Sequence, residues 1–231
     1  MEWGSGVLAG LALGAAVVYG LHFAMREVKG VLGAAVKTAS TALLALAVAL
    51  AGQRGGGWFC LVPLGLALGA LGDLCLAWKA ERAFLAGVGA FGLGHLAYAG
   101  GFLLRSGELG FDAVSPGTGA ALAGLAALLV STEVWLAPCT GSLRGPVRAY
   151  VALIGLMGAA AVLLPGAPGQ GMLRAGAALF ILSDLMLAVQ MFVARDPALR
   201  RGLALALWPA YWTGQALIGW GALVFWGAAT G

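Results

Sequence analysis

Long apolar runs constrain this chain more than any other feature of its sequence. Runs rich in Ala, Leu, Val and Gly, each of about 20 residues, recur along the chain and match the span of a bilayer core. Apolar residues make up 61% of the 231 residues and charged residues only 10%. A soluble domain carries about 25% charged residues. The sequence therefore predicts an integral membrane protein.

The apolar runs divide into eight segments with short connections. The expected spans are 3–24, 31–51, 58–78, 83–104, 117–137, 147–164, 172–194 and 203–228. Short connections make consecutive helices antiparallel neighbours and leave no room for a soluble domain. We therefore expect an all-α, polytopic membrane protein with eight transmembrane helices, forming a single transmembrane domain over residues 1–231.

Lysine and arginine are unevenly shared between the two sets of connections. Nine follow the odd-numbered spans, namely Arg26, Lys29, Lys79, Arg82, Arg144, Arg148, Arg195, Arg200 and Arg201. Three follow the even-numbered spans, namely Arg54, Arg105 and Arg174. Connections rich in these residues stay in the cytoplasm. We expect a protein of the cell inner membrane with both termini on the extracytoplasmic side.

Few ionisable side chains fall at membrane depth. Asp73 lies in LGALGDLCLAW and Asp184 in LFILSDLMLAV. The others at this depth are Lys37, His95 and Glu133. A charge there costs about 3 kcal/mol on insertion scales, so such residues usually face the bundle interior and are candidates for function. The structural alternatives are an ion pair of Asp73 with Lys37 or Arg82, and a helix-packing role for Asp184.

The two aspartates share the local pattern [GS]-D-L-x-L-A at an offset of 111 residues (184 − 73). The same offset overlays Lys37 on Arg148. This offset suggests two four-helix repeats, 1–111 and 112–231. An even number of spans in each half makes such repeats parallel, related by an axis along the membrane normal. Chance matching in a sequence so rich in Ala, Leu and Gly is the alternative.

Segment 69–104 carries the most specific motif of the chain. It has Gly-Asp near a helix end, a short charged connection, and then residues at helical spacing: Phe84, Gly87, Phe91, His95 and Tyr98. At this point the chain resembles the YhhN family of membrane proteins, which includes the lysoplasmalogenases.

Three further segments resemble that family. Lys37 opens KTAST, which is similar to the start of the family's second helix, and 179–188 is similar to its second aspartate motif. Tyr211-x-x-x-Gln215 is similar to its last helix. One departure is Thr38, which stands directly after Lys37 where the family typically has a proline.

The resemblance implies a membrane hydrolase that cleaves the vinyl-ether bond of lysoplasmalogens to a fatty aldehyde and a glycerophospho-head group. Cleavage begins with protonation at carbon and gives an oxocarbenium ion, which water captures. Two carboxyls in unlike environments suit this chemistry, as in glycoside hydrolysis. Burial disfavours the charged form of a carboxyl, so one of them can stay protonated near neutral pH.

We assign catalytic roles to Asp73 and Asp184, as an acid/base pair, and to His95, as a proton relay. Substrate-binding roles go to Lys37, which would hold the phosphate, and to Tyr98, Tyr211 and Gln215. The expected partners are a lysophospholipid substrate and membrane lipid, without metal, cofactor or nucleic acid, and the oligomeric state is left open. A small proton-coupled transporter or a lipid-binding membrane protein is the alternative, because midplane carboxylates and parallel repeats suit carriers equally well.

Overall fold

A computed structural model describes residues 3–25, 30–52, 57–78 and 80–227. These residues form helices, turns and loops without any strand. The long helices are α1 (Trp3–Val18), α2 (Val31–Ala51), α3 (Leu61–Leu76), α4 (Glu81–Leu109), α5 (Pro116–Trp135), α6 (Arg144–Val162), α7 (Gln170–Ala188) and α8 (Pro197–Gly227). Short π-helical turns extend two of them, η1 (Tyr19–Ala24) after α1 and η5 (Val189–Val193) after α7.

The helices have the length and composition of membrane spans. Within the described residues, 7 helical segments are long and apolar enough to cross a membrane. The segment outside that set is α8, in which Trp208, Tyr211 and Gln215 lower the hydropathy. Its 31 residues are nevertheless long enough, at about 1.5 Å per residue, to cross a core of about 30 Å. The all-α polytopic membrane fold is confirmed.

Helices α4 and α8 extend beyond the expected spans, because those spans stop at charged residues that the helices in fact include. Helix α4 continues to Leu109, and its buried Arg105 pairs at 2.8 Å with Glu108 one turn further on. Helix α8 begins at Pro197, where proline suits the first turn of a helix. Asp196 precedes it, and its carboxylate accepts the N–H of Leu199 at 2.9 Å.

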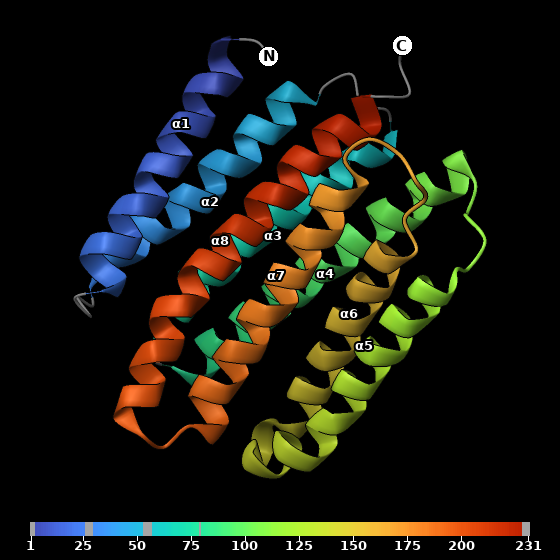
Figure 1. The fold of residues 1–231 in the computed structure, drawn as a ribbon. Helices are drawn as coiled ribbons and strands as arrows, with labels where there is room; N and C mark the ends of the chain where they lie inside the picture. The colour runs from blue at the N-terminus through green and yellow to red at the C-terminus, as the bar shows by residue number, and fades with distance from the viewer. Residues whose placement is uncertain (1–2, 26–29, 53–56, 79, 228–231) are drawn as a thin grey trace.

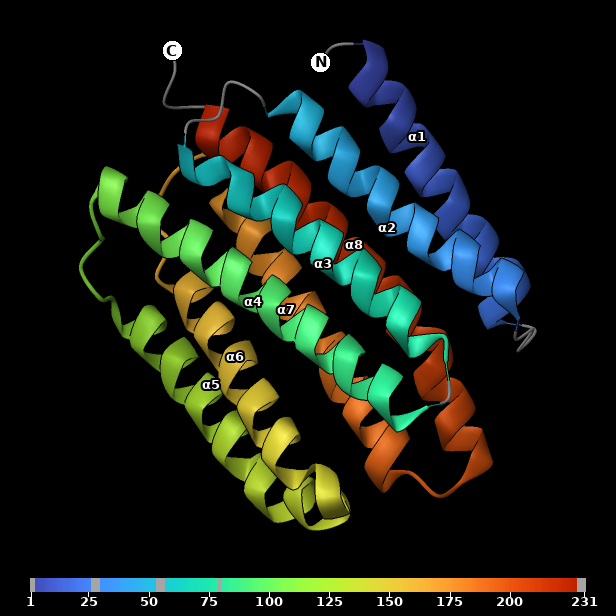
Figure 2. The same ribbon diagram turned by 180° about the vertical axis from the view of Figure 1, so that it is seen from behind.

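The helix axes lie roughly side by side, with consecutive helices antiparallel, and form an elongated bundle (Figure 1). Helices α1 and α2 form one edge, α5 and α6 form the opposite edge, and α3, α4, α7 and α8 fill the centre. Figure 2 shows the same order from behind, with α3 and α4 on the near side. We call the end at which α1, α3, α5 and α7 finish the basic end, because six described arginines of the odd-numbered connections belong to it: Arg82, Arg144, Arg148, Arg195, Arg200 and Arg201.

The pattern of helix neighbours supports the proposed repeat. Within the halves, α1 packs on α2 and α3 on α4, as α5 packs on α6 and α7 on α8. Between the halves, α2 packs on α8 as α6 packs on α4. A four-helix unit repeated about an axis along the bundle would produce these matched pairs. We retain the two parallel halves, 1–111 and 112–231, as a proposal.

Glycines set the closest helix contacts of the centre. A Cβ at Gly176 of α7 would lie 2.8 Å from the carbonyl oxygen of Gly214 of α8, so only small residues allow this approach. On α3, the space beside the glycines is occupied by side chains of other helices rather than by a helix backbone. A Cβ at Gly65 would lie 2.5 Å from the Tyr98 ring, and one at Gly69 would lie 2.7 Å from the Gln215 amide nitrogen. The glycines of α3 therefore make room for polar side chains of α4 and α8.

We propose that the basic end faces the cytoplasm, and cysteine labelling tests this. Gly145 lies at the basic end and Gly107 near the opposite end, and both are exposed. In a chain without its native cysteines, Gly145→Cys should react with a membrane-impermeant maleimide only from the cytoplasmic side. Gly107→Cys should react only from outside, because the charge bias places it there. The reverse labelling pattern would contradict the orientation.

Candidate functional site

Asp73 lies at the centre of a buried polar cluster formed by α2, α3 and α8. The Lys37 ammonium lies 2.8 Å from one carboxylate oxygen. The other oxygen accepts hydrogen bonds from the hydroxyls of Thr41, at 3.2 Å, and Tyr211, at 3.0 Å. Lys37 and Thr41 are four residues apart and so project from the same face of α2. We call these four residues the Asp73 cluster.

Three aromatic rings also lie near the Lys37 ammonium. Its nitrogen lies 6.0 Å from the ring centre of Tyr19, 5.7 Å from that of Trp208 and 6.0 Å from that of Tyr211. Ring faces attract cations at such distances. The ion pair foreseen as the structural alternative for Asp73 is therefore present, and it fixes both partners in a well-defined position.

Asp184 has a different partner. Its carboxylate lies 3.1 Å from Nε2 of His95, which is fully buried on α4. The other ring nitrogen, Nδ1, lies 2.8 Å from the backbone carbonyl oxygen of Phe91. A carbonyl oxygen can only accept, so Nδ1 carries a hydrogen and donates it.

This contact is favourable when one proton is shared between His95 and Asp184. With Nδ1 protonated, a neutral imidazole presents a lone pair at Nε2, and an ionised carboxylate presents only lone pairs in return. Two facing acceptors in a dry interior are unfavourable, and they become favourable when one proton lies between them. Such a proton would sit either on His95 or on Asp184, and in both forms the pair as a whole would be neutral. The pair is thus a candidate proton donor.

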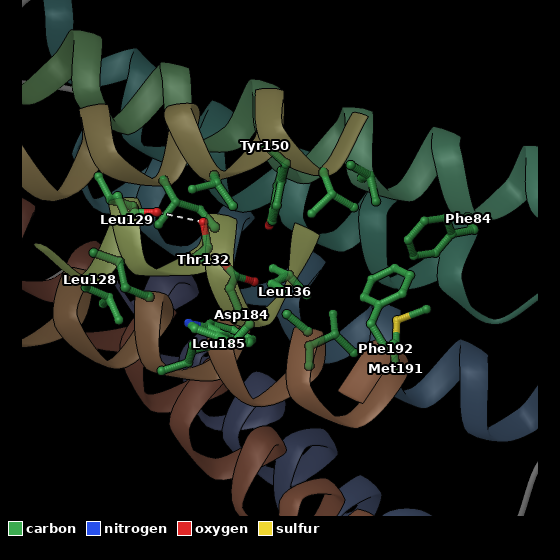
Figure 3. Close-up of a pocket in the computed structure, with 18 residues that line it drawn as sticks. Phe84, Leu128, Leu129, Thr132, Leu136, Tyr150, Asp184, Leu185, Met191 and Phe192 are labelled. Atoms are coloured by element: carbon green, nitrogen blue, oxygen red, sulfur yellow. Dashed lines mark hydrogen bonds between the residues drawn. The ribbon is translucent and has the colours of Figure 1, made fainter. Parts of the chain in front are cut away.

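Tyr150 of α6 completes this second cluster. Its ring lies edge-on to the His95 ring, with 5.4 Å between their centres. Its hydroxyl is directed toward Asp184, with which it interacts electrostatically (Figure 3). Asp184 and Tyr150 also line a narrow pocket of about 80 Å³. We call His95, Tyr150 and Asp184 the Asp184 cluster.

The pocket beside Asp184 is almost entirely apolar. Figure 3 shows it between α5, α6 and α7, with Phe84 and Phe192 toward the basic end. The hydroxyl of Thr132 also reaches the pocket, but it donates to the Leu129 carbonyl at 2.6 Å. The pocket therefore offers one polar cluster, that of Asp184, against walls suited to hydrocarbon.

Phe180 connects the two clusters. Its ring centre lies 4.4 Å from that of His95 and 5.6 Å from that of Tyr211. Phe91, whose carbonyl holds the His95 ring, contacts the rings of both Phe180 and Tyr211. Each aspartate thus has its own partners, and an aromatic layer joins the two groups.

A wider cavity of about 610 Å³ opens at the basic end, and we call it the basic vestibule. Lys37 lines it and so connects it with the Asp73 cluster. Leu76 and Leu187 line it as well, each three residues beyond an aspartate. The vestibule therefore reaches to within about one helical turn of both aspartates. Its other polar residues are Tyr19, Gln190, Arg195, Arg200, Arg201 and Trp208.

Tyr98 and Gln215 pair with each other rather than with either aspartate. The Tyr98 hydroxyl donates to the Gln215 side-chain oxygen at 2.5 Å, and both residues are fully buried. Their contact joins α4 to α8 in the bundle centre. Substrate binding by these two residues remains a prediction, and the geometry favours a structural role.

Glu133 lies outside both clusters. Its exposed carboxylate pairs with Arg148 at the basic end, so α5 is tied to α6 there.

Sequence reasoning missed Tyr150 as a candidate. The only indication was its place two residues after Arg148, in the segment that the 111-residue offset overlays on Lys37.

Metal chemistry has no evident ligand set in the part of the chain that the structure describes. No group of three or more His, Cys, Asp or Glu side chains there could hold a metal ion. The His95 and Asp184 side chains are instead directed at each other. The side chains of both clusters are of the kinds that transfer protons and stabilise charge.

Comparison with known proteins identifies the family. A family model described as the YhhN family matches residues 32–222, which include both clusters. The chain belongs to the YhhN family. Lysoplasmalogenase TMEM86A of Homo sapiens is 32% identical to it over 162 residues, and that of Bos taurus is 33% identical over 162 residues. The match covers 67% of this chain and 62% of each relative. No solved structure matches significantly.

Removing the Tyr98 hydroxyl tests whether that residue is structural. Tyr98→Phe would leave the Gln215 side-chain oxygen without its donor in a dry interior. We expect the free energy of unfolding to fall by about 1–3 kcal/mol, seen as a lower thermal midpoint in detergent. The double variant Tyr98→Phe/Gln215→Leu should recover part of that loss. An unchanged midpoint with a raised KM would instead assign Tyr98 to substrate binding.

Proposed function

We propose that this YhhN-family membrane protein hydrolyses the vinyl-ether bond of lysoplasmalogens to a fatty aldehyde and a glycerophospho-head group. The observation that carries the proposal is the buried 3.1 Å contact between His95 Nε2 and the Asp184 carboxylate, at the edge of an apolar pocket. The names of the human and bovine relatives support the same activity.

In the proposed first step, the shared proton moves to the vinyl carbon that is not bonded to oxygen. The carbon bonded to oxygen becomes part of an oxocarbenium ion, and the pair of His95 and Asp184 is left with one negative charge. That charge lies beside the developing cation and lowers the barrier to its formation. Here Asp184 acts as proton donor, and His95 and Tyr150 hold its carboxyl in position.

In the second step, water adds to the oxocarbenium carbon and gives its proton back to the same pair. The resulting hemiacetal collapses to the aldehyde and the glycerol hydroxyl. One water is consumed and the pair regains its starting protonation. The same group thus serves as acid and then as base, as microscopic reversibility requires in glycoside hydrolysis.

Asp73 takes the role of the ionised carboxyl in this scheme. Three donors, Lys37, Thr41 and Tyr211, hold its carboxylate. Hydrogen bonds and an adjacent cation favour the charged form of a carboxyl. We assign Asp73 to electrostatic support of the cationic intermediate, with Tyr211 linking it through Phe180 to His95. In this proposal the acid/base pair expected from sequence becomes one proton donor and one carboxylate paired with Lys37.

The alkenyl chain fits the hydrocarbon surfaces on the α5 side of Asp184. A groove of about 660 Å³ shares Leu128, Ile181 and Leu185 with the apolar pocket. It continues along α5 and α7 to Ser115 and Arg174. We assign the chain to the pocket and this groove, which would be reached from the lipid phase.

Aldehyde release from purified protein tests the proposal. Wild-type protein incubated with a lysoplasmalogen should release fatty aldehyde. Asp184→Asn should lower the rate at least about 100-fold, the scale of a general acid–base contribution. Asp73→Asn should also lower it about 100-fold, the scale of a lost electrostatic contribution to the transition state. Glu133→Gln is the matched carboxyl control, because Glu133 is exposed and lies outside both clusters, and its rate should stay at the wild-type level.

Folding of each variant is checked by gel filtration, so that a loss of rate is not a loss of protein. A wild-type rate from Asp184→Asn would remove Asp184 from the mechanism. Wild-type protein that moves labelled lipid across a sealed vesicle but releases no aldehyde would be a carrier. Binding without either result would indicate a lipid-binding protein.

A further inference from the structure

The basic vestibule carries a cluster of positive charge that the chemistry at Asp184 does not use. Arg195, Arg200 and Arg201 line this cavity of about 610 Å³ at the start of α8. Gln190 donates to the backbone carbonyl of Arg200 at 3.0 Å, so the segment is tied to the end of α7. All three arginines are exposed and line this one cavity.

Two carboxylates of the described residues near the vestibule already have partners. Asp73 is neutralised by Lys37 on the inner side of the cavity. Asp196, in the same segment as the arginines, accepts the N–H of Leu199 and caps α8. The described lining residues carry four positive side chains and no carboxylate, so the cavity favours an anion. Guanidinium groups match phosphate in particular, because their planar fork can donate two parallel hydrogen bonds.

The position of the vestibule along the helices relates it to the proposed reaction at the aspartates. Leu76 and Leu187 line the vestibule, one turn beyond Asp73 and Asp184 respectively. One turn corresponds to a rise of about 5 Å. In a lysoplasmalogen, three glycerol carbons separate the ether oxygen from the phosphate ester oxygen. A phosphate in the vestibule therefore leaves the ether bond about one turn deeper, at the level of the aspartates.

We propose that Arg195 and Arg200, with Arg201 beside them, bind the phosphate diester of a lysophospholipid head group in the basic vestibule. This inference rests on the proposed function and specifies how its substrate is held. The arginines, rather than Lys37, then make the main contact with the phosphate, because Lys37 already neutralises Asp73. Lys37 then contributes from the floor of the cavity.

Binding of lipids that cannot be hydrolysed tests the site apart from the reaction. The probes are 1-O-hexadecyl-glycero-3-phosphocholine, which has a saturated ether, and 1-O-hexadecylglycerol, which lacks the phosphate. Full-length wild-type protein in detergent should bind the first about tenfold more tightly than the second, as expected for charge-assisted hydrogen bonds. Arg200→Gln and Arg195→Gln should each reduce that preference and leave binding of the alkylglycerol unchanged.

Arg144→Gln is the matched control, because it removes one positive charge at the basic end outside the vestibule. Its preference for the phosphate lipid should equal that of wild type. Full preference retained in both Arg195→Gln and Arg200→Gln would overturn the proposal. So would inorganic phosphate that competes as strongly as the lipid, since the site would then bind free anions. Neither probe can be hydrolysed. The binding test therefore gives its answer whether or not the protein releases aldehyde from a lysoplasmalogen, and the two proposals can fail separately.

Discussion

The structure depends on the neutralisation of two carboxyls inside an apolar bundle. An unpaired carboxylate in such an interior costs several kcal/mol, so each aspartate needs a partner brought from another helix. Asp73 takes a cation from α2, and Asp184 takes an imidazole from α4. The first contact ties α3 to its neighbour α2, and the second ties α7 to α4, which is distant in the sequence. Both lie where we propose that the substrate chemistry occurs.

The two clusters also follow one plan, which supports the proposed repeat. In each half, the aspartate lies on the third helix, and its partners come from the second helix of the same half and the fourth helix of the other. The two sets are Lys37, Asp73 and Tyr211, and Tyr150, Asp184 and His95. The halves then differ in chemistry. One set contains a lysine–carboxylate ion pair and the other a histidine–carboxyl contact, and we propose that this difference gives the two carboxyls different tasks.

Sequence predicted the helices well, because apolar length and short connections leave few alternatives in a membrane. It misplaced the start of α8 because Arg200 and Arg201 looked like a connection, whereas Asp196 caps a helix that carries them. It also singled out Asp73 and Asp184, because isolated charges stand out in an apolar run. Their partners were harder to predict. Tyr150 has no unusual local pattern, and its role depends on α6 packing against α4.

The most direct test of the central claim is the isotope content of the aldehyde formed in D₂O. If the proton between His95 and Asp184 is delivered to the vinyl carbon, the aldehyde should carry one deuterium on its second carbon. Reducing the aldehyde at once to the alcohol preserves that label for mass spectrometry. An aldehyde released without deuterium at that carbon would show that the bond breaks by another route, and would contradict the role assigned to the Asp184 cluster.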